Sequence, residues 1–529
     1  MKTEEVTVDP RLSLKPVTQL LAHYSDETPL CFAKGATDID QKRGLTLYGP
    51  SDKSDLGPQT IRIGIVSSAD GIQQVTSWVQ QFTERAIPAK GLRPFIEQTF
   101  PGFLKAFHCR LLTSSNHNEE LLNKEINQLV AIVNPNMRIK KAAQLYASKV
   151  KNICRRVPRP DVIICHEPAL VEERCGAGMS SSDKRKGALS PKEKDAAEKI
   201  REAVQTHHVL LAPLDEDTQN LIEMVVNQDF RASLKAKCLS EPAPVQILTQ
   251  TILEKMLNHE QEVHPKIGQD AATIAWNIGA AIYYKANHQP WRVGQLRQGT
   301  CYVGISFYHD QTTADEDMHA SLAQIFSETG EGMVVRGDSF KWNVENEGEP
   351  RLYEESAFTL LDSAIKVYKQ HHNDQPPNRV CIHKSSRYSA SERKGFLRAC
   401  TDVPKCDLVA LGRRKDVSFV RNGDNPVLRG TRIPLGSSSY LIYTKGYNTY
   451  QRGYHKPRIP RPLEITEYYG DTSLDEIGQE ILALTRLNWN TTDYCIYWPV
   501  TLEFSNRVGE ILGKVPAGEP ISENYYKYM

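Results

Sequence analysis

Hydrophobic positions in the first half of the chain alternate between short apolar runs and amphipathic stretches. Residues 61–67 and 107–112 read as strands, residues 71–85 between them as a helix, and residues 161–165 as another buried strand. Strands that alternate with helices in this way are typical of a parallel sheet covered by helices. Residues 1–60 instead carry Pro, Asp and Gly turn signals with little periodicity, which predicts an extended lead-in packed against later domains.

A second series of strand signals begins near Thr300. Before the third strand of this series, an amphipathic stretch at residues 354–371 predicts a helix. The order of elements favours an RNase H-like sheet, so the whole chain is predicted to be α/β. The apolar runs that read as strands lie at residues 301–307, 332–337, 379–383 and 407–411.

Length and composition fit a globular protein of two or three domains. The chain has 529 residues, of which 40% are hydrophobic and 24% charged, and its formal net charge is +1. A nucleic-acid surface would therefore have to be a local patch. Eleven cysteines without a CxxC pair, and a start without an apolar export core, predict free thiols in a reducing cytoplasm. No apolar run approaches the about 20 residues that cross a bilayer.

Cationic and amide side chains recur between residues 229 and 285 in an order suited to an anion. A helix at 229–237 places two cations four residues apart on one face, an extended stretch follows at 244–248, and a helix at 271–286 carries a third cation near its end. A terminal phosphate has several acceptor oxygens and about two negative charges, which suits such groups. An Arg/Lys pair on a helix more often marks a face exposed to solvent than a binding site. The candidate residues are Arg231, Lys235, Gln246 and Lys285.

This region resembles the pocket that holds the 5′ end of the guide strand in Argonaute MID domains. The likeness includes Trp276-Asn277, Tyr283-Tyr284-Lys285 and Pro290-Trp291. Residues 40–50 and 61–66 are similar to the start of a prokaryotic MID domain, and other segments are similar to the end of a PIWI domain. Those segments are 484–490, 498–502 and 525–529.

The resemblance implies a short prokaryotic Argonaute without the family's amino-terminal and PAZ domains. It implies a lead-in at 1–60, a Rossmann-like MID domain at 61–295 and an RNase H-like PIWI domain at 296–529. The positions matching the four candidate residues grip the guide 5′ phosphate in that family, often with a divalent ion. We therefore expect Mg²⁺ at the phosphate, with Gln246 and the C-terminal carboxylate of Met529 as ligands.

The PIWI-like half departs from the family pattern at its catalytic positions. RNase H-like nucleases hold two Mg²⁺ ions about 4 Å apart with carboxylates on adjacent strands. Where slicing Argonautes carry those acids, this chain has Ser306 after Gly304-Ile305, Lys384 between His383 and Ser385, and Asn506. Serine and an amide are poor ligands for Mg²⁺, and Lys384 is expected to repel the metals. The chain is therefore predicted to bind without cutting.

Other acids keep two alternatives open. Glu345, Glu354 or Glu355 could be a remnant of the family's mobile glutamate. An active nuclease could instead draw its acids from Asp310, Asp338 or Asp407. A small-molecule α/β enzyme is a third reading, but the sequence has neither a Gly-rich phosphate loop nor a Ser/His/Asp order.

A segment rich in Arg, Lys, Tyr and Gly follows residue 411 and extends to residue 462. Cations neutralise phosphates and aromatic rings stack on bases, so the segment is predicted to line a guide and target duplex with little sequence preference. Basic edge strands that resist aggregation are the alternative. A second basic cluster at 180–186 is predicted to be a surface loop. The duplex candidates are Arg413, Arg414, Lys415, Arg429, Arg432 and Lys445.

The resemblance also implies partners. A short Argonaute of this kind is expected to bind a 5′-phosphorylated guide RNA and a single-stranded DNA target. It is also expected to form a heterodimer with an APAZ-containing effector, in a defence system against plasmids or phage. The effector could be of the TIR, SIR2-like or nuclease type, and no residue of the sequence selects among them.

Overall fold

A computed structural model describes the chain at residues 22–90, 95–176, 229–258, 269–294, 296–309, 318–326, 332–340, 349–414, 417–435, 440–454, 459–516 and 518–529. It contains a four-stranded, a ten-stranded and a three-stranded sheet. The expected α/β class, with a Rossmann-like half followed by an RNase H-like half, is confirmed. Among the described residues, no helix combines the length and apolar character needed to cross a bilayer.

The four-stranded sheet is parallel throughout, in the order β5-β4-β6-β7. Every residue of β6 is buried, as expected for an inner strand covered on both faces, whereas β7 is an edge strand with three half-buried residues. The strands are β4 (Gln59–Ser67), β5 (Cys109–Glu120), β6 (Val162–Glu167) and β7 (Val245–Thr249).

Helices cover both faces of this sheet with apolar side chains. One group packs on the face that carries Ile164, and the other packs on the face that carries Ile163. The first group is α2 (Ala69–Glu84), α3 (Phe103–Phe107), α11 (Gln250–Leu257) and α12 (Ala271–Lys285). The second is α4 (Asn123–Val130), α5 (Pro135–Cys154), α6 (Ala169–Cys175) and α10 (Phe230–Cys238).

The ten-stranded sheet has an RNase H-like centre. Three antiparallel strands, β9, β10 and β11, lie beside β13 and β14, which run parallel to β9. Beyond β14 the sheet continues with β17, β16, β15 and β1, in that order. The short strand β12 pairs with β10. The strands are β1 (His23–Tyr24), β9 (Thr300–His309), β10 (Met318–Phe326), β11 (Gly332–Arg336), β12 (Ser339–Phe340), β13 (Arg379–Lys384), β14 (Lys405–Arg413), β15 (Thr431–Pro434), β16 (Tyr440–Ile442) and β17 (Leu463–Tyr469).

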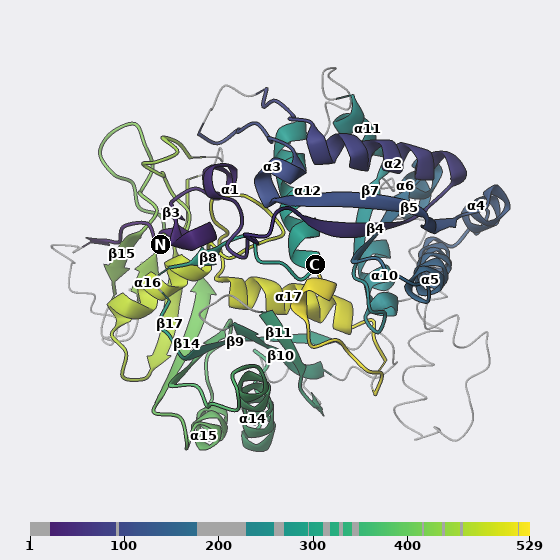
Figure 1. Cartoon of the computed structure of the whole chain (residues 1–529). Helices are drawn as coiled ribbons and strands as arrows, with labels where there is room; N and C mark the ends of the chain where they lie inside the picture. Colours follow the sequence, from purple (N-terminus) through teal and green to yellow (C-terminus); the bar gives the residue numbers. More distant parts are fainter. Residues whose placement is uncertain are drawn as a thin grey trace, which may run out of the picture.

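The two faces of the larger sheet are covered by different helices. Figure 1 shows α14 (Glu354–His371) and α15 (Ala390–Ala399) together on one side and α17 (Val500–Leu512) on the other. Helix α17 lies close to β9 because residue 304 is a glycine: a Cβ there would sit 2.2 Å from the carbonyl oxygen of Thr501. Helix α16 (Leu474–Leu484) also contributes to the core on the α17 side.

The lead-in is more structured than predicted. Helix α1 (Gln41–Tyr48) begins after Asp40, whose carboxylate accepts a hydrogen bond from the backbone N–H of Arg43. Strands β2 (Leu30–Cys31) and β3 (Thr37–Asp38) form the small sheet with β8 (Arg292–Val293). The prediction of an extended segment is therefore wrong for α1, whose helix cap was not recognised. The expected packing against later parts of the chain is confirmed, because Leu30 and Leu45 belong to the main hydrophobic core and β2 pairs with β8.

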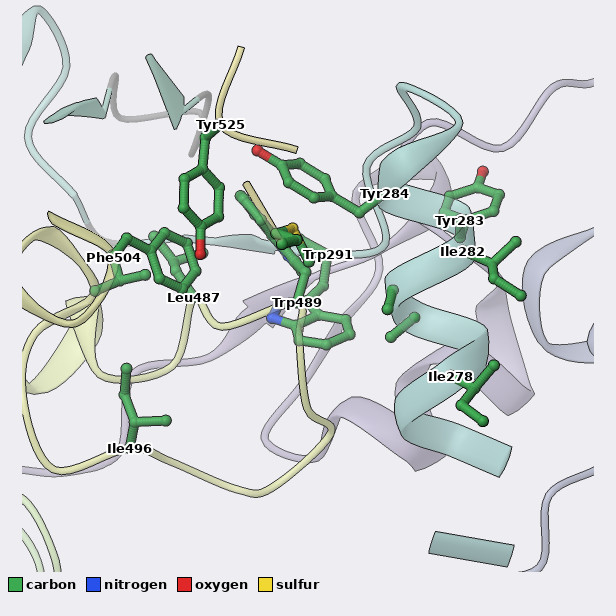
Figure 2. Close-up of a cluster of buried hydrophobic side chains, with 14 of the residues drawn as sticks. Ile278, Ile282, Tyr283, Tyr284, Trp291, Leu487, Trp489, Ile496, Phe504 and Tyr525 are labelled. Atoms are coloured by element: carbon green, nitrogen blue, oxygen red, sulfur yellow. The ribbon is translucent and has the colours of Figure 1, made fainter. Parts of the chain in front are cut away.

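Aromatic residues join the two halves into one hydrophobic core. Trp489 donates from Nε1 to the carbonyl oxygen of Trp291 at 3.2 Å, and its ring lies 4.4 Å from that of Tyr284. Tyr525, near the C-terminus, stacks on Phe504 of α17 with 3.9 Å between ring centroids. Figure 2 shows these side chains gathered beside α12. The chain's end is consequently fixed between α12 and α17, where Figure 1 marks it.

Candidate nucleic-acid interface

Helix α10 presents the first two candidate cations. It begins after Asp229, whose carboxylate accepts from the backbone N–H of Ala232 at 3.0 Å. Arg231, in the first turn, is exposed, whereas Lys235, one turn later, has only 2% of its surface exposed. The expectation that both lie on one helix is confirmed, but only Arg231 faces solvent.

The other two candidates meet at the edge of the parallel sheet. Lys285 is the last residue of α12 and is 3% exposed, and Gln246 lies on the edge strand β7. The Nζ of Lys285 donates to Oε1 of Gln246 at 2.6 Å. We use the term cradle for the four residues Arg231, Lys235, Gln246 and Lys285.

Electrostatics connect the cradle cations with one another. Burial holds the pKa of Lys235 well below its usual value, and the charges of Lys285 and Arg231 lower it further. Burial also lowers the pKa of Lys285 to about 7, again with a contribution from Arg231. Three cationic side chains are therefore close enough to oppose one another's charge. A multivalent anion placed among them would relieve that repulsion.

Sequence reasoning missed a fourth cation, Arg507 of α17. Its charge also lowers the pKa of Lys235, so it lies near the cradle although it comes from the other half of the chain. The guanidinium is held by Glu503, one turn earlier, at 3.0 Å. In the sequence this pair has the ordinary i,i+4 spacing of a solvated helix face, so no local signal could have separated it from surface charge.

The C-terminal tail closes one side of the cradle. Lys235 donates from Nζ to the backbone carbonyl oxygen of Tyr528 at 3.2 Å, and Met529 is 2% exposed. Lys527 donates to the carbonyl oxygens of Leu239 and Glu241, which follow α10, at 3.2 and 2.8 Å. The tail is thus docked against the cradle, as expected from its tyrosines.

The donor atoms at the cradle do not fit a resident Mg²⁺ ion. Mg²⁺ prefers octahedral oxygen ligands, with carboxylates prominent among them. The amide oxygen of Gln246 already accepts from Lys285, which leaves the carboxylate of Met529 as the anionic oxygen of the expected pair. Among the described residues, no group of three or more His, Cys, Asp or Glu side chains is arranged to hold a metal. The cations of the cradle can therefore neutralise a phosphate by themselves, and Mg²⁺ bound together with the phosphate stays a prediction.

One of the three positions that stand for catalytic acids, Lys384, lies on the opposite face of the sheet from Ser306. Ser306 is buried on the β9 face that packs against α17, and Asn506 is exposed on α17. Lys384 points to the opposite face of the sheet, where it forms a buried ion pair with Glu392 of α15. The expectation that Lys384 lies beside the metal positions is therefore wrong. The cause is strand alternation: Lys384 of β13 is paired with Ile305 of β9, whose side chain also faces α14 and α15.

The acids that an active nuclease could use instead differ in burial. Asp407 is buried and its carboxylate is fully engaged, because it accepts from Arg379 at 2.5 Å, from Thr472 and from Tyr468. Burial opposes ionisation, yet the Arg379 guanidinium and the two hydroxyls hold the pKa of Asp407 below its usual value. Asp338 is exposed. Asp310 lies outside the described residues.

Two of the three candidate remnants of a mobile glutamate lie away from the face of Ser306. Glu354 and Glu355 are in the first turn of α14 and pair with Arg398 of α15 at 3.3 and 2.6 Å. Because α14 and α15 cover the other face of the sheet, these two acids cannot contribute to a site at Ser306. Glu345 lies outside the described residues.

Two of the predicted duplex contacts are wrong. Arg429 is 3% exposed and donates to Glu27, at 2.9 Å, and to main-chain and hydroxyl oxygens around it. Arg432 is 5% exposed and donates to the carboxylate and carbonyl oxygens of Asp475 at 2.8 and 2.9 Å. Both guanidiniums are buried with protein acceptors and therefore stabilise the fold instead of facing a ligand.

The remaining duplex candidates are more accessible. Arg413 is exposed, with its guanidinium 5.0 Å from the ring centroid of Tyr497 and 5.6 Å from that of Trp498. Arg414 is half-buried and pairs with Glu464 at 3.2 Å, and Lys445 is also half-buried. Lys415 and the basic cluster at 180–186 lie outside the described residues. Among these candidates, Arg413 with its two aromatic neighbours is best suited to contact a nucleic-acid strand.

The chain is similar to known proteins in structure, whereas comparisons of its sequence found no match. No protein-family model and no curated protein sequence matches the chain. The structure is similar to Clostridium butyricum Argonaute bound to a guide DNA and a 19-mer target DNA, with a TM-score of 0.60 and 14% identity over 96% of this chain and 55% of that chain.

Two other solved structures give the same result. The A. aeolicus Argonaute has a TM-score of 0.51 and 14% identity over 94% of this chain and 55% of its own. Drosophila Piwi has a TM-score of 0.57 and 11% identity over 96% of this chain and 56% of its own. The chain thus has an Argonaute-like fold and spans about half the length of these solved structures.

Proposed function

We propose that the chain is the guide-binding subunit of a short prokaryotic Argonaute system. It holds the 5′-phosphorylated end of a guide strand in the cradle and recognises a complementary strand without cutting it. The observation that carries this proposal is the convergence of Arg231, Lys235 and Lys285 on one site closed by the chain's own tail. The Argonaute-like fold supports the proposal independently of the residues in the site.

The chemistry of the cradle suits a phosphomonoester. Lys235 and Lys285 supply compact, buried amines that can carry positive charge beside an anion, and the exposed Arg231 can offer two parallel N–H donors to one phosphate. Gln246 fixes the position of Lys285 through its amide oxygen. A dianionic end group gains more from these charges than a hydroxyl or an internal phosphodiester, so the site should distinguish strand ends.

Residue chemistry in the PIWI-like half supports binding without cleavage. Ser306 and Asn506 offer a hydroxyl and an amide where carboxylates would be needed for Mg²⁺. Asp407, the one buried alternative among the described acids, is engaged by Arg379. In this proposal a bound guide therefore pairs with its target, and the target is not cleaved.

The remaining parts of the proposal concern chemistry and partners. We propose an RNA guide, a single-stranded DNA target and a heterodimer with an APAZ-containing effector that carries the enzymatic activity. A protein that captures a target without cutting it needs such a partner to report the capture. The exposed Arg413 at the end of β14, with the half-buried Arg414 and Lys445, would contact the backbone of the guide and target duplex.

Target capture and cleavage can be measured in one assay. The purified chain is loaded with a 5′-phosphorylated guide and incubated with a labelled complementary or scrambled DNA strand, in Mg²⁺ and in Mn²⁺. Retention of the complementary strand alone, at full length, is expected. Specific cleavage opposite the middle of the guide would overturn the non-cutting assignment, and equal retention of both strands would overturn guided recognition.

A further inference from the structure

A surface patch outside the cradle combines aromatic rings with guanidinium groups. Phe95 is 39% exposed, and its ring lies edge-on to that of Tyr450, with 6.0 Å between the ring centroids. The guanidinium of Arg452 lies 5.5 Å from the ring centroid of Phe95, and that of Arg43 lies 4.9 Å from that of Tyr450. We use the term aromatic patch for these four residues. It is built from α1 and from two loops that are far apart in the sequence.

The loop that carries Phe95 is fixed to the start of α1. Lys42, which is 7% exposed, donates from Nζ to the carbonyl oxygen of Ile96 at 3.0 Å. Gln98 donates to the carboxylate of Asp40, at 3.1 Å, and to the carbonyl oxygen of Phe95, at 3.3 Å. These bonds hold the backbone of the loop in place, so a ligand that contacts the ring of Phe95 would lose little entropy by ordering it.

The loop that carries Arg452 has an unfavourable backbone conformation. Two backbone hydrogen bonds between Asn448 and Gly453, at 3.0 and 3.3 Å, close the loop, and the side chain of Asn448 accepts from the backbone N–H of Gln451 at 2.9 Å. Arg452 is held in the left-handed region, with a φ of 47°, where glycine is favoured. An arginine at this position indicates that its side chain has a role that glycine cannot fill.

The two arginines of the aromatic patch differ in their partners. Arg43 pairs with Asp38 at 2.8 Å, so its charge is balanced within the fold. Arg452 is exposed, and among the described residues no carboxylate pairs with it. An exposed ring beside such a guanidinium suits a nucleotide, because a nucleotide offers a planar base for the ring and a phosphate for the cation together.

Helix α12 relates the aromatic patch to the cradle. Trp276, in the second turn of α12, donates from Nε1 to the carbonyl oxygen of Gln98 in the Phe95 loop at 3.2 Å. Lys285 of the cradle lies nine residues further along the helix, about 14 Å at the usual rise per residue. A dinucleotide held in the cradle is therefore too short to reach the patch, whereas a strand of about 18 nucleotides, at about 3.4 Å each, is long enough.

We propose that the aromatic patch is a second contact site for the strand held in the cradle, where Phe95 stacks on a base and Arg452 binds the neighbouring phosphate. This inference rests on the proposed function, because it concerns the same bound strand. It adds an internal contact that depends neither on the base sequence nor on the 5′ end group.

Competition titrations with a long strand of about 18 nucleotides and with a dinucleotide, each with a 5′ phosphate or a 5′ hydroxyl, test the role of Phe95. Phe95→Leu keeps an apolar side chain without the ring and should weaken binding of the long strand about tenfold, by the same factor for both end groups. Phe95→Trp keeps a stacking surface and should bind at least as tightly as the wild type. The phosphorylated dinucleotide should bind all three proteins alike.

The outcomes separate this inference from the proposed function. Unchanged binding of the long strand by Phe95→Leu would overturn the inference and leave a protein as the occupant of the aromatic patch. Equal affinity of the wild type for phosphorylated and hydroxyl strands would overturn the proposed function instead.

Arg452→Gly tests the second residue of the contact without straining the loop, because glycine adopts the left-handed conformation readily. The variant should melt at the wild-type temperature or above it, yet reduce the salt dependence of log K for the long strand by about one. Phe358→Ala is the matched control, because Phe358 lies 4.0 Å from the guanidinium of Arg398, which is paired with Glu354 and Glu355. This control should leave the salt slope unchanged. An unchanged slope in Arg452→Gly would overturn the assignment of Arg452.

Discussion

Lys285 donates a 2.6 Å hydrogen bond from Nζ to Oε1 of Gln246 and so joins the end of α12 to the edge strand β7. An ammonium group has three N–H donors, and this bond uses one of them. The bond therefore orients the amine without exhausting its ability to donate. A phosphate entering the cradle would find Lys285 already positioned, which lowers the entropy that binding must lose.

Arg507 should contribute to the binding of strand ends although it belongs to the other half of the chain. Arg507→Ala is expected to weaken binding of a 5′-phosphorylated strand by about tenfold or more, as for the loss of one charge-assisted contact of about 1.5 to 3 kcal/mol. Fluorescence anisotropy with both end groups measures the effect. Arg110→Ala, which breaks a surface ion pair with Glu84 at 2.7 Å, is the matched control and should leave the affinity unchanged. An equal loss for phosphorylated and hydroxyl strands would show that Arg507 does not act on the phosphate.

The contribution of Lys285 to the free energy of unfolding of the protein without a guide should rise with pH between about 7 and about 10. The pKa of Lys285 is about 7 in the folded chain, whereas the unfolded lysine keeps its proton up to its ordinary pKa of 10.5. Within this window the unfolded state binds more protons, so raising the pH favours the folded state by at most about 1.4 kcal/mol per pH unit.

Urea denaturation of the wild type and of Lys285→Met at several pH values isolates this contribution. The methionine variant should be the more stable protein near pH 7, because it avoids burying a charge, and its advantage should shrink as the pH rises. A difference between the two proteins that does not change with pH would contradict the assignment of a depressed pKa to Lys285.

Arg413 and Arg432 should have opposite effects although both belong to the basic segment. Arg413→Ala should weaken the binding of duplexes of any sequence and reduce the salt dependence of log K by about one, because one phosphate contact is lost. Arg432→Ala should lower the free energy of unfolding, because its guanidinium is buried against Asp475. Salt-dependent binding and urea denaturation of both variants separate the two roles. A salt slope changed by Arg432→Ala and not by Arg413→Ala would reverse our assignment.

Asp407 should stabilise the fold and take no part in catalysis. Asp407→Asn removes one of the two buried carboxylate partners of Arg379, because Glu480 remains, and is expected to cost about 1.5 to 3 kcal/mol of stability. Because the folded pKa of Asp407 is depressed, its contribution is present above the ordinary pKa of an aspartate and is lost as the pH falls through the folded value. Denaturation at neutral and acidic pH tests this, and full stability of the variant at neutral pH would contradict it.

Local patterns in the sequence predicted the elements that carry the cradle. The helices at α10 and α12 and the strand between them followed from apolar periodicity, and Lys285 stood close to the expected end of its helix. The approach of Arg507 could not be predicted in this way, because it depends on how α17 packs beside α10.

Buried charge was the main source of error. Arg429 looked like a surface cation because its partner, Glu27, is 402 residues away in the sequence. Lys384 was placed on the wrong face because a shift of one residue in a strand reverses the direction of the side chain. Ion pairs and registers of this kind are set by tertiary packing, and a single sequence does not display them.

The affinity difference between a 5′-phosphorylated and a 5′-hydroxyl strand of the same sequence tests the central claim most directly. If the cradle binds the strand end, the phosphorylated strand should bind the wild type about 100-fold more tightly or better, and the combined change of Arg231, Lys235 and Lys285 to alanine should remove the difference. Lys149→Ala, which removes a half-buried ion pair with Glu125 on the second helix group, should preserve it. Equal affinity of the wild type for both strands would contradict the account.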